Sequence, residues 1–116
     1  MLIVDDKKNI KLSRGDYAEI SFNFKNEDGT DYVLEEGEKV EFTVKTSASS
    51  TTEFISKNLS SGGGSFVVLV LEKEDTEKLI FGRYVYDIRL IKADGKTHTP
   101  MLKADFEVLE VVGDGN

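Results

Sequence analysis

One stretch of this chain decides its fold: EDTEKLIFGRYVYDI, which occupies residues 74–88. It begins with an acidic, helix-like turn that carries Leu79, and Gly82 follows three residues later. Tyr84 then opens an alternating strand. A chain that crosses between the two layers of a β-sandwich often has this order, and a tyrosine near the start of the arriving strand bonds back to the corner. We therefore predict a structural corner built from Asp75, Leu79, Gly82 and Tyr84.

The carboxylates of this turn allow two interpretations. Glu72, Glu74, Asp75 and Glu77 could serve acid/base chemistry, because they cluster in sequence. The positive end of a short helical turn also favours Asp and Glu, and Asp75 or Thr76 can accept a capping hydrogen bond. We interpret the cluster as a capped turn and assign it no catalytic role.

The rest of the chain reads as short segments in which apolar and polar residues alternate, separated by turn residues, which is typical of strands. This pattern predicts an all-β, immunoglobulin-like antiparallel β-sandwich of about seven to eight strands with one short helical turn. A small closed barrel is the structural alternative. The predicted strands are Asn9–Leu12, Tyr17–Phe24, Lys39–Lys45, Thr52–Lys57, Phe66–Leu71, Arg83–Ile91 and Thr97–Leu109, with a short edge piece at Asp31–Leu34.

The segment Phe66–Leu71 differs from the others because it is apolar throughout. It is expected either to be a central strand buried on both faces or to present its outer face to a partner. In the second case Val67, Leu69 and Leu71 form a candidate interface.

Composition narrows the class of protein. The chain has 116 residues, which predicts one domain over residues 1–116, and residues 110–116 are expected to form a flexible tail. The absence of cysteine excludes a disulfide framework and thiolate chemistry. A net charge of -7 disfavours phosphate backbones, so no nucleic-acid partner is expected. No apolar run approaches the roughly 18 residues that span a bilayer, and the acidic N-terminus is unlike a signal peptide, so no membrane partner is expected.

Three motifs that could carry site chemistry have simpler structural interpretations. The segment from Phe24 to Glu35 partly mimics a calcium loop, but Phe24 stands at the first ligand position, so we interpret residues 26–29 as a hairpin turn. His98 is the only histidine and has no second histidine or cysteine with which to build a metal site. The run Gly62–Gly64 lacks the residues of a phosphate loop. We therefore expect no catalytic residue, no cofactor and no metal.

A family resemblance is carried by short motifs that follow one another along nearly the whole chain. They are Arg14-Gly15-Asp16, Asp28-Gly29-Thr30, Lys39–Lys45, Glu74-Asp75-Thr76, Leu79, Gly82–Ile88, Asp94-Gly95, Thr97 and Phe106-Glu107-Val108. With this ordered set, the chain resembles small immunoglobulin-like β-sandwich proteins encoded among the virion genes of tailed phages and prophages of Gram-positive bacteria.

The resemblance implies a non-enzymatic structural or accessory protein of a baseplate, tail or head, or the N-terminal module of an upper-baseplate-type protein. Its partners would be other virion proteins or further copies of itself, and it would be made in the host cytoplasm and located in the virion. Arg14-Gly15-Asp16 would be a strand-entry turn and not an integrin ligand. The alternative is a bacterial surface module that binds carbohydrate or another ligand, which is weakened by the absence of tryptophan.

Overall fold

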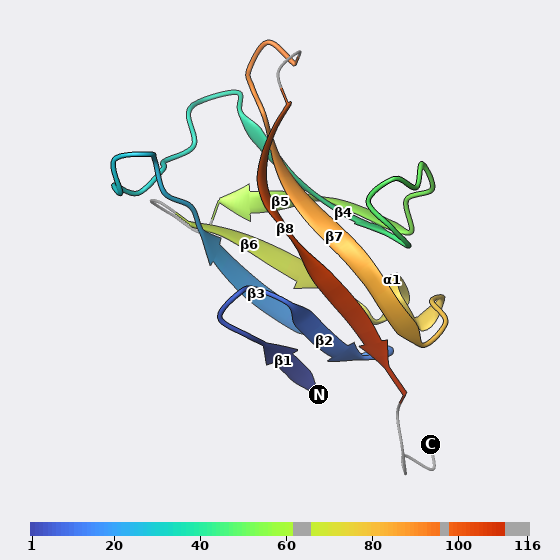
Figure 1. The fold of residues 1–116 in the computed structure, drawn as a ribbon. Coiled ribbons are helices and arrows are strands. Elements are labelled where there is room, and N and C mark those ends of the chain that lie inside the picture. The colour runs from blue at the N-terminus through green and yellow to red at the C-terminus, as the bar shows by residue number, and fades with distance from the viewer. Residues whose placement is uncertain (62–65, 96–97, 111–116) are drawn as a thin grey trace.

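The computed structural model describes residues 1–61, 66–95 and 98–110. Within these ranges the chain forms strands and one short helix, drawn in Figure 1. The elements are β1 Leu2–Val4, β2 Ile10–Ser13, β3 Ala18–Asn23, β4 Lys39–Lys45, β5 Ile55–Ser61, β6 Phe66–Leu71, α1 Lys73–Glu77, β7 Gly82–Ile91 and β8 His98–Leu109.

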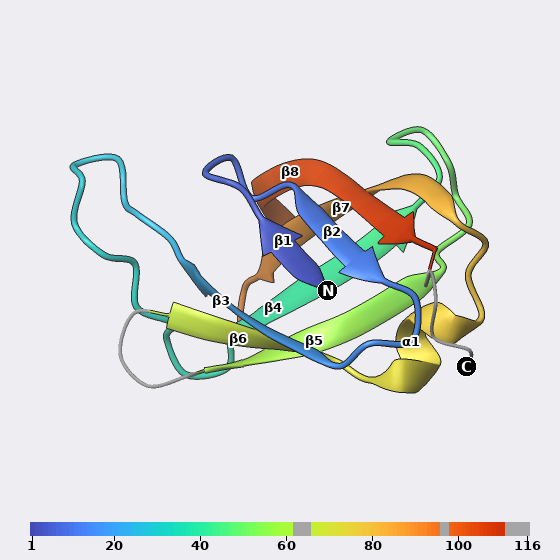
Figure 2. The same ribbon diagram turned by 90° about the horizontal axis from the view of Figure 1, so that it is seen from below.

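The strands are hydrogen-bonded in the order β1-β2-β8-β7-β4-β5-β6-β3. β5 belongs to both layers, because its residues 55–59 pair with β4 and its residues 60–61 pair with β6. The sheet therefore folds over at β5, and Figure 2 shows the β5-β6-β3 layer beneath the layer that contains β2, β8, β7 and β4. The prediction of an all-β sandwich is confirmed.

Several details differ from the predicted pattern. The sandwich is not purely antiparallel, because β2 runs parallel to β8, with Ile10 opposite Phe106. β1 was not predicted, and it forms a hairpin with β2 in which Leu2 lies opposite Leu12. The predicted edge piece at Asp31–Leu34 is reduced to one isolated bridge between Lys25 and Asp31.

The core lies between the two layers and contains a cluster of aromatic rings. The ring of Tyr86 lies 5.2 Å from that of Phe42 in the same layer and 6.3 Å from that of Phe22 in the opposite layer. Phe106 extends the cluster from β8, with its ring 6.2 Å from Phe42. Such rings are large and bury roughly 150–250 Å² each, so this cluster ties the two layers together.

The candidate interface on β6 is a wrong prediction. Val67, Leu69 and Leu71 are buried, with at most 3% of their surface exposed. The physical reason is the register with β3, which places them opposite Phe22, Ile20 and Ala18, all buried in the core. Residues 66, 68 and 70 alternate with them and are exposed or half-buried. β6 is therefore buried on one face only.

Candidate functional site

The corner between the layers begins at the short helix α1. The Asp75 carboxylate accepts a hydrogen bond from the backbone N–H of Glu72 at 2.7 Å, so it caps the start of the helix. The same carboxylate forms an ion pair with Lys57 of β5. Leu79 follows the helix and is 3% exposed, which anchors the corner in the core.

Tyr84 closes the corner from the start of β7. Its hydroxyl donates a hydrogen bond to the Ile80 carbonyl oxygen at 2.9 Å, and its ring meets the Phe54 ring edge-on at 5.6 Å. Gly82 lies between Ile80 and Tyr84 in the sequence and has a φ of 143°, a conformation that residues with a Cβ rarely adopt. The four residues of the predicted corner thus lie in one continuous segment that runs from α1 into the start of β7.

The turn before β3 packs against this corner. The backbone N–H of Gly15 donates to the Thr76 hydroxyl at 2.8 Å, and Thr76 is fully buried. The Arg14 guanidinium donates to the Leu79 carbonyl oxygen at 3.4 Å and lies 4.7 Å from the centre of the Phe81 ring. Residues 14–16 therefore serve a structural contact at the place where the chain enters β3.

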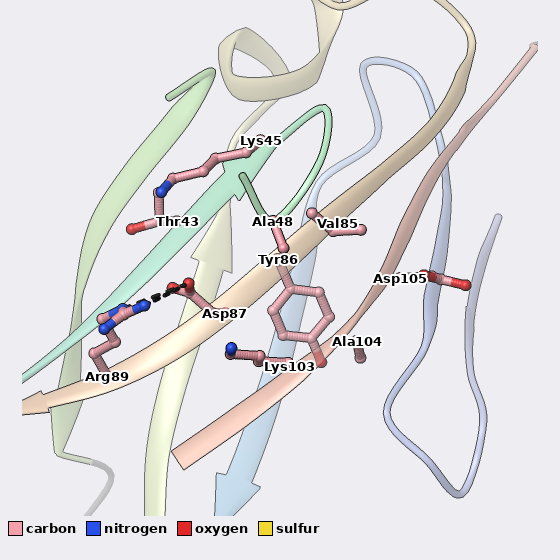
Figure 3. Close-up of a pocket in the computed structure, with 10 residues that line it drawn as sticks. All are labelled: Thr43, Lys45, Ala48, Val85, Tyr86, Asp87, Arg89, Lys103, Ala104 and Asp105. Atoms are coloured by element: carbon pink, nitrogen blue, oxygen red, sulfur yellow. Dashed lines mark hydrogen bonds and ion pairs between the residues drawn. The ribbon is translucent and has the colours of Figure 1, made fainter. Parts of the chain in front are cut away.

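A shallow cavity of about 260 Å³ lies on the outer face of β4, β7 and β8. Figure 3 shows the side chains around it, which come from these three strands and from the loop after β4. No residue of this cavity was predicted as a site, because its composition depends on the register of three strands that are distant in sequence. The lining residues are Thr43, Lys45, Ala48, Val85, Tyr86, Asp87, Arg89, Lys103, Ala104 and Asp105.

Asp87 is the central charge of this cavity. The strand register places it between Thr43 on β4 and Lys103 on β8. Its Oδ2 atom lies 3.5 Å from Nε of Arg89, the ion pair that is dashed in Figure 3. Its Oδ1 atom is buried and has no hydrogen-bond partner among the described residues. Because a buried acceptor without a partner costs about 1–3 kcal/mol, this atom marks a position where a donor from outside would bind favourably.

The other charges around the cavity are mostly positive. Within the described part of the chain, neither Lys45 nor Lys103 forms an ion pair. Tyr86 contributes only to the wall, since it is 2% exposed and its hydroxyl donates to the Lys8 carbonyl oxygen at 2.5 Å. Burial raises the pKa of Tyr86, so its hydroxyl stays protonated. The cavity is suited to a group that combines a hydrogen-bond donor with negative charge.

A second surface of interest is the edge of β3 along which no other described strand pairs, called here the free edge of β3. β3 ends the strand order and pairs with β6 in one uninterrupted register from Ala18 to Asn23. The side chains of Glu19, Ser21 and Asn23 point away from the core and are exposed. A groove of about 370 Å³ runs beside this edge, and its lining residues are Lys8, Ser21, Phe22, Asn23 and Phe66.

The turn between β1 and β2 borders this groove and was missed by sequence reasoning. Lys8 adopts a left-handed backbone conformation with φ of 69°. The Asp5 carboxylate accepts hydrogen bonds from the backbone and side-chain N–H groups of Asn9, and these bonds lower the pKa of Asp5. The side-chain oxygen of Asn9 in turn accepts a hydrogen bond from the backbone N–H of Asp105 at 2.9 Å, which fixes the turn to β8. The signal in the sequence was the pair Asp5 and Asn9 around a short polar turn.

A buried carboxylate holds the long loop between β3 and β4. Glu38 is 2% exposed in its side chain and accepts hydrogen bonds from the Tyr32 hydroxyl at 2.6 Å and from Lys92 at 3.3 Å. Burial acts to raise the pKa of Glu38, but the hydrogen bonds that it accepts outweigh this effect and leave the pKa below its ordinary value. This cluster joins the loop to the end of β7.

The motifs weighed as metal or phosphate sites can be placed only in part. Residues 26–29 form a turn in which the backbone N–H of Gly29 donates to the Asn26 carbonyl oxygen at 3.0 Å. Among the described residues, no group of three histidine, cysteine or acidic side chains is arranged to hold a metal ion. The side chain of His98 and the glycines at 62–64 lie outside the described part, as do residues 111–116 of the predicted tail.

In the described ranges, no helix has both the length and the apolar character that a membrane span requires. No protein family, curated protein or solved structure was found to match the chain.

Proposed function

We propose that this chain is a non-enzymatic structural or accessory protein of a tailed-phage or prophage virion that acts through protein–protein contacts. The family resemblance of the ordered sequence motifs supports the class of protein. Under this proposal the protein is made in the host cytoplasm and belongs to the baseplate, tail or head. Its partners are other virion proteins or further copies of itself. We propose no catalytic activity and no nucleic-acid or membrane partner.

The free edge of β3 is the observation that carries this proposal. An edge strand presents unpaired N–H and C=O groups, and proteins usually protect such edges with prolines, bulges, charges or very short strands. β3 has six residues, no proline and no break in its register, and Glu19 is its only charged residue. An edge of this kind is suited to pair with a strand of another chain.

The proposal is tested on particles from a host that carries the gene. After induction, particles purified on a density gradient are digested and their peptides are identified by mass spectrometry. We expect peptides of this chain to co-migrate with capsid and tail proteins, and we expect capsid, portal or tail genes beside its gene. A chain that is abundant in the lysate but missing from the particles would contradict the proposal, as would a gene placed in a metabolic operon.

The cavity on β4, β7 and β8 favours a second candidate, a module that binds a small ligand. The observation that favours it is the buried Oδ1 atom of Asp87, which lacks a partner among the described residues and lies near Lys45 and Lys103. The hydroxyl group of such a ligand would donate to Asp87, and a carboxylate or phosphate on the same ligand would pair with Lys45 and Lys103. A sugar here would be held by hydrogen bonds, because Tyr86 is the only aromatic residue among those labelled around the cavity in Figure 3, and its side chain is buried in the core.

A glycan array that includes acidic and phosphorylated sugars tests this second candidate. We expect a bound glycan to lose at least tenfold in affinity with Asp87→Asn, since the amide replaces one acceptor oxygen by a donor. Glu41→Gln is the matched control, because Glu41 lies on the same face of β4 but outside the cavity. Binding at background level across the array, or equal losses with both variants, would remove the candidate.

A further inference from the structure

We propose that two copies of this chain pair along β3, antiparallel and about a twofold axis that passes between their Ser21 residues. The inference rests on the proposed function and names the partner at this edge as a second copy. Two β5-β6-β3 layers would then form one continuous sheet of six strands across the dimer, with the two cores on the same face of that sheet.

The free edges of the molecule differ in how well they are protected. β1 is also an edge strand, but it has three residues, and short edge strands offer few groups for pairing. β3 is twice as long, and its register with β6 contains no bulge. A strand of a second copy that pairs with β3 would lie about 4.8 Å from it. β3 is therefore the edge at which a second copy gains most backbone hydrogen bonds.

The alternation of β3 restricts how a second copy can align. Directly opposed residues of antiparallel strands point to the same face of a sheet. Ala18, Ile20 and Phe22 face the core, whereas Glu19, Ser21 and Asn23 are exposed. A twofold axis normal to the sheet must keep the core faces of both copies together, so a shift by one residue is excluded. The axis can therefore pass only midway between a residue of β3 and the same residue of the second copy, such as residue 19, 20, 21 or 22.

Charge selects one of these alignments. An axis at residue 19 would place Glu19 directly opposite Glu19 of the second copy. An axis at residue 20 would place the two Glu19 side chains in diagonal positions. Like charges at such positions repel. An axis at residue 21 places Glu19 opposite Asn23 of the second copy and diagonal to its Lys25, which is exposed and also forms an ion pair with Asp31 of its own chain. The same axis keeps five residues of each β3, from 19 to 23, in direct pairing.

An axis at residue 22 would bring Glu19 opposite Lys25, but it leaves only three residues of each β3, from 21 to 23, in direct pairing, because β3 ends at Asn23. The alignment on Ser21 therefore combines the longer pairing with favourable charges. In this alignment Tyr17, which is 57% exposed, faces Lys25 of the second copy and can form a cation–π contact.

Single cysteines test this alignment cleanly, because the chain has no cysteine of its own. Opposed Cα atoms of antiparallel strands lie about 4.5–5.5 Å apart, which is within the range of a disulfide. Ser21→Cys is expected to form a disulfide dimer under mild oxidation. Glu19→Cys and Asn23→Cys are each expected to remain largely monomeric, because equal residues there lie about 14 Å apart. An equimolar mixture of these two variants is expected to cross-link.

The matched control is Glu41→Cys, which places the thiol on a central strand where no edge is available. We expect it to dimerise at least tenfold more slowly than Ser21→Cys. Equal rates for the two variants, or cross-linking of Glu19→Cys alone in preference to Ser21→Cys, would overturn the proposed alignment. Non-reducing gel electrophoresis and mass spectrometry give the readout, and circular dichroism verifies that each variant is folded.

A charge exchange gives an independent measurement on the protein without thiols. Sedimentation velocity of the wild-type chain is expected to show a concentration-dependent monomer–dimer equilibrium. Glu19→Lys or Lys25→Glu alone should raise the dimer dissociation constant roughly three- to tenfold, since each creates two like-charge diagonals in the symmetric dimer. The double exchange should restore the wild-type value. A strictly monomeric wild-type chain, or a double exchange that weakens the dimer further, would overturn self-pairing.

The two proposals fail in different experiments. Presence in purified particles tests the proposed function and is independent of what pairs with β3. Cross-linking of Ser21→Cys in the purified chain tests self-pairing and is independent of the virion. If Ser21→Cys stays monomeric alone but cross-links to a different particle protein, self-pairing is overturned and the proposed function is supported.

Discussion

Replacement of Tyr84 by phenylalanine removes one atom from the corner between the layers. The Tyr84 side chain is 8% exposed, and its hydroxyl makes one hydrogen bond, to the Ile80 carbonyl oxygen at 2.9 Å. Phenylalanine keeps the ring and its edge-on contact with Phe54 at 5.6 Å. The substitution therefore isolates the hydrogen bond from the packing.

One intramolecular hydrogen bond contributes a net free energy of about 0.5–1.5 kcal/mol to stability. We expect Tyr84→Phe to lower the free energy of unfolding by that amount and the melting temperature by about 4 °C. Tyr84→Ala removes the ring as well and is expected to cost roughly 3–5 kcal/mol. Urea unfolding followed by far-ultraviolet circular dichroism measures both, because the strands dominate the signal.

Tyr17→Phe is the matched control. Tyr17 also loses a hydroxyl that is hydrogen-bonded, to Glu19, but its side chain is 57% exposed and water can replace the bond. Its effect is expected to stay within about 0.5 kcal/mol. If Tyr84→Phe and Tyr17→Phe unfold at the same urea concentration as the wild-type chain, the reasoning that Tyr84 pins the corner is refuted.

Three further changes test other parts of the fold by the same unfolding assay. Gly82→Ala should cost roughly 1–3 kcal/mol, because φ of 143° is strained for a residue with a Cβ, and an unchanged midpoint would contradict this. Leu69→Ala should cost about 2–5 kcal/mol, whereas Val68→Ala on the opposite face of β6 should cost less than about 1.5 kcal/mol; equal costs would contradict one-sided burial. The lowered pKa of Glu38 means that its contribution to stability is complete above the unfolded pKa near 4.5 and is lost as the pH falls through the lower folded pKa. Glu38→Gln should therefore be less stable than the wild-type chain at pH 7 and should lose less stability between about pH 5 and pH 3; parallel pH profiles would count against this cluster.

The sequence predicts local structure best where a strand has a strong pattern and clear turn residues. The bounds of β4, Lys39–Lys45, and of β6, Phe66–Leu71, agree with the structure. β5 was expected at Thr52–Lys57 but spans Ile55–Ser61, because its second half is polar and reads as a loop. β1 was missed because three residues near a terminus carry no period that can be recognised.

The burial of β6 shows why an apolar run is ambiguous. Six apolar residues in a row fit a strand buried on both faces equally well as a strand buried on one. The partners decide between them: β3 covers one edge and the core covers one face, so residues 67, 69 and 71 are buried while Phe66 remains 38% exposed. Sequence alone does not give these partners.

The sequence by itself determined the fold class and the corner motif, because alternation, turn residues and the spacing from Asp75 to Tyr84 are local properties of the chain. Only the tertiary structure decided that β2 runs parallel to β8, that β5 bends from one layer into the other, and that β3 stands last in the order of the described strands. It also decided that Thr43, Asp87 and Lys103 stand in one row of the outer face. These features depend on pairing between strands that are far apart in sequence. The free energy of that pairing is a sum over the whole core, so no single segment of the sequence determines it.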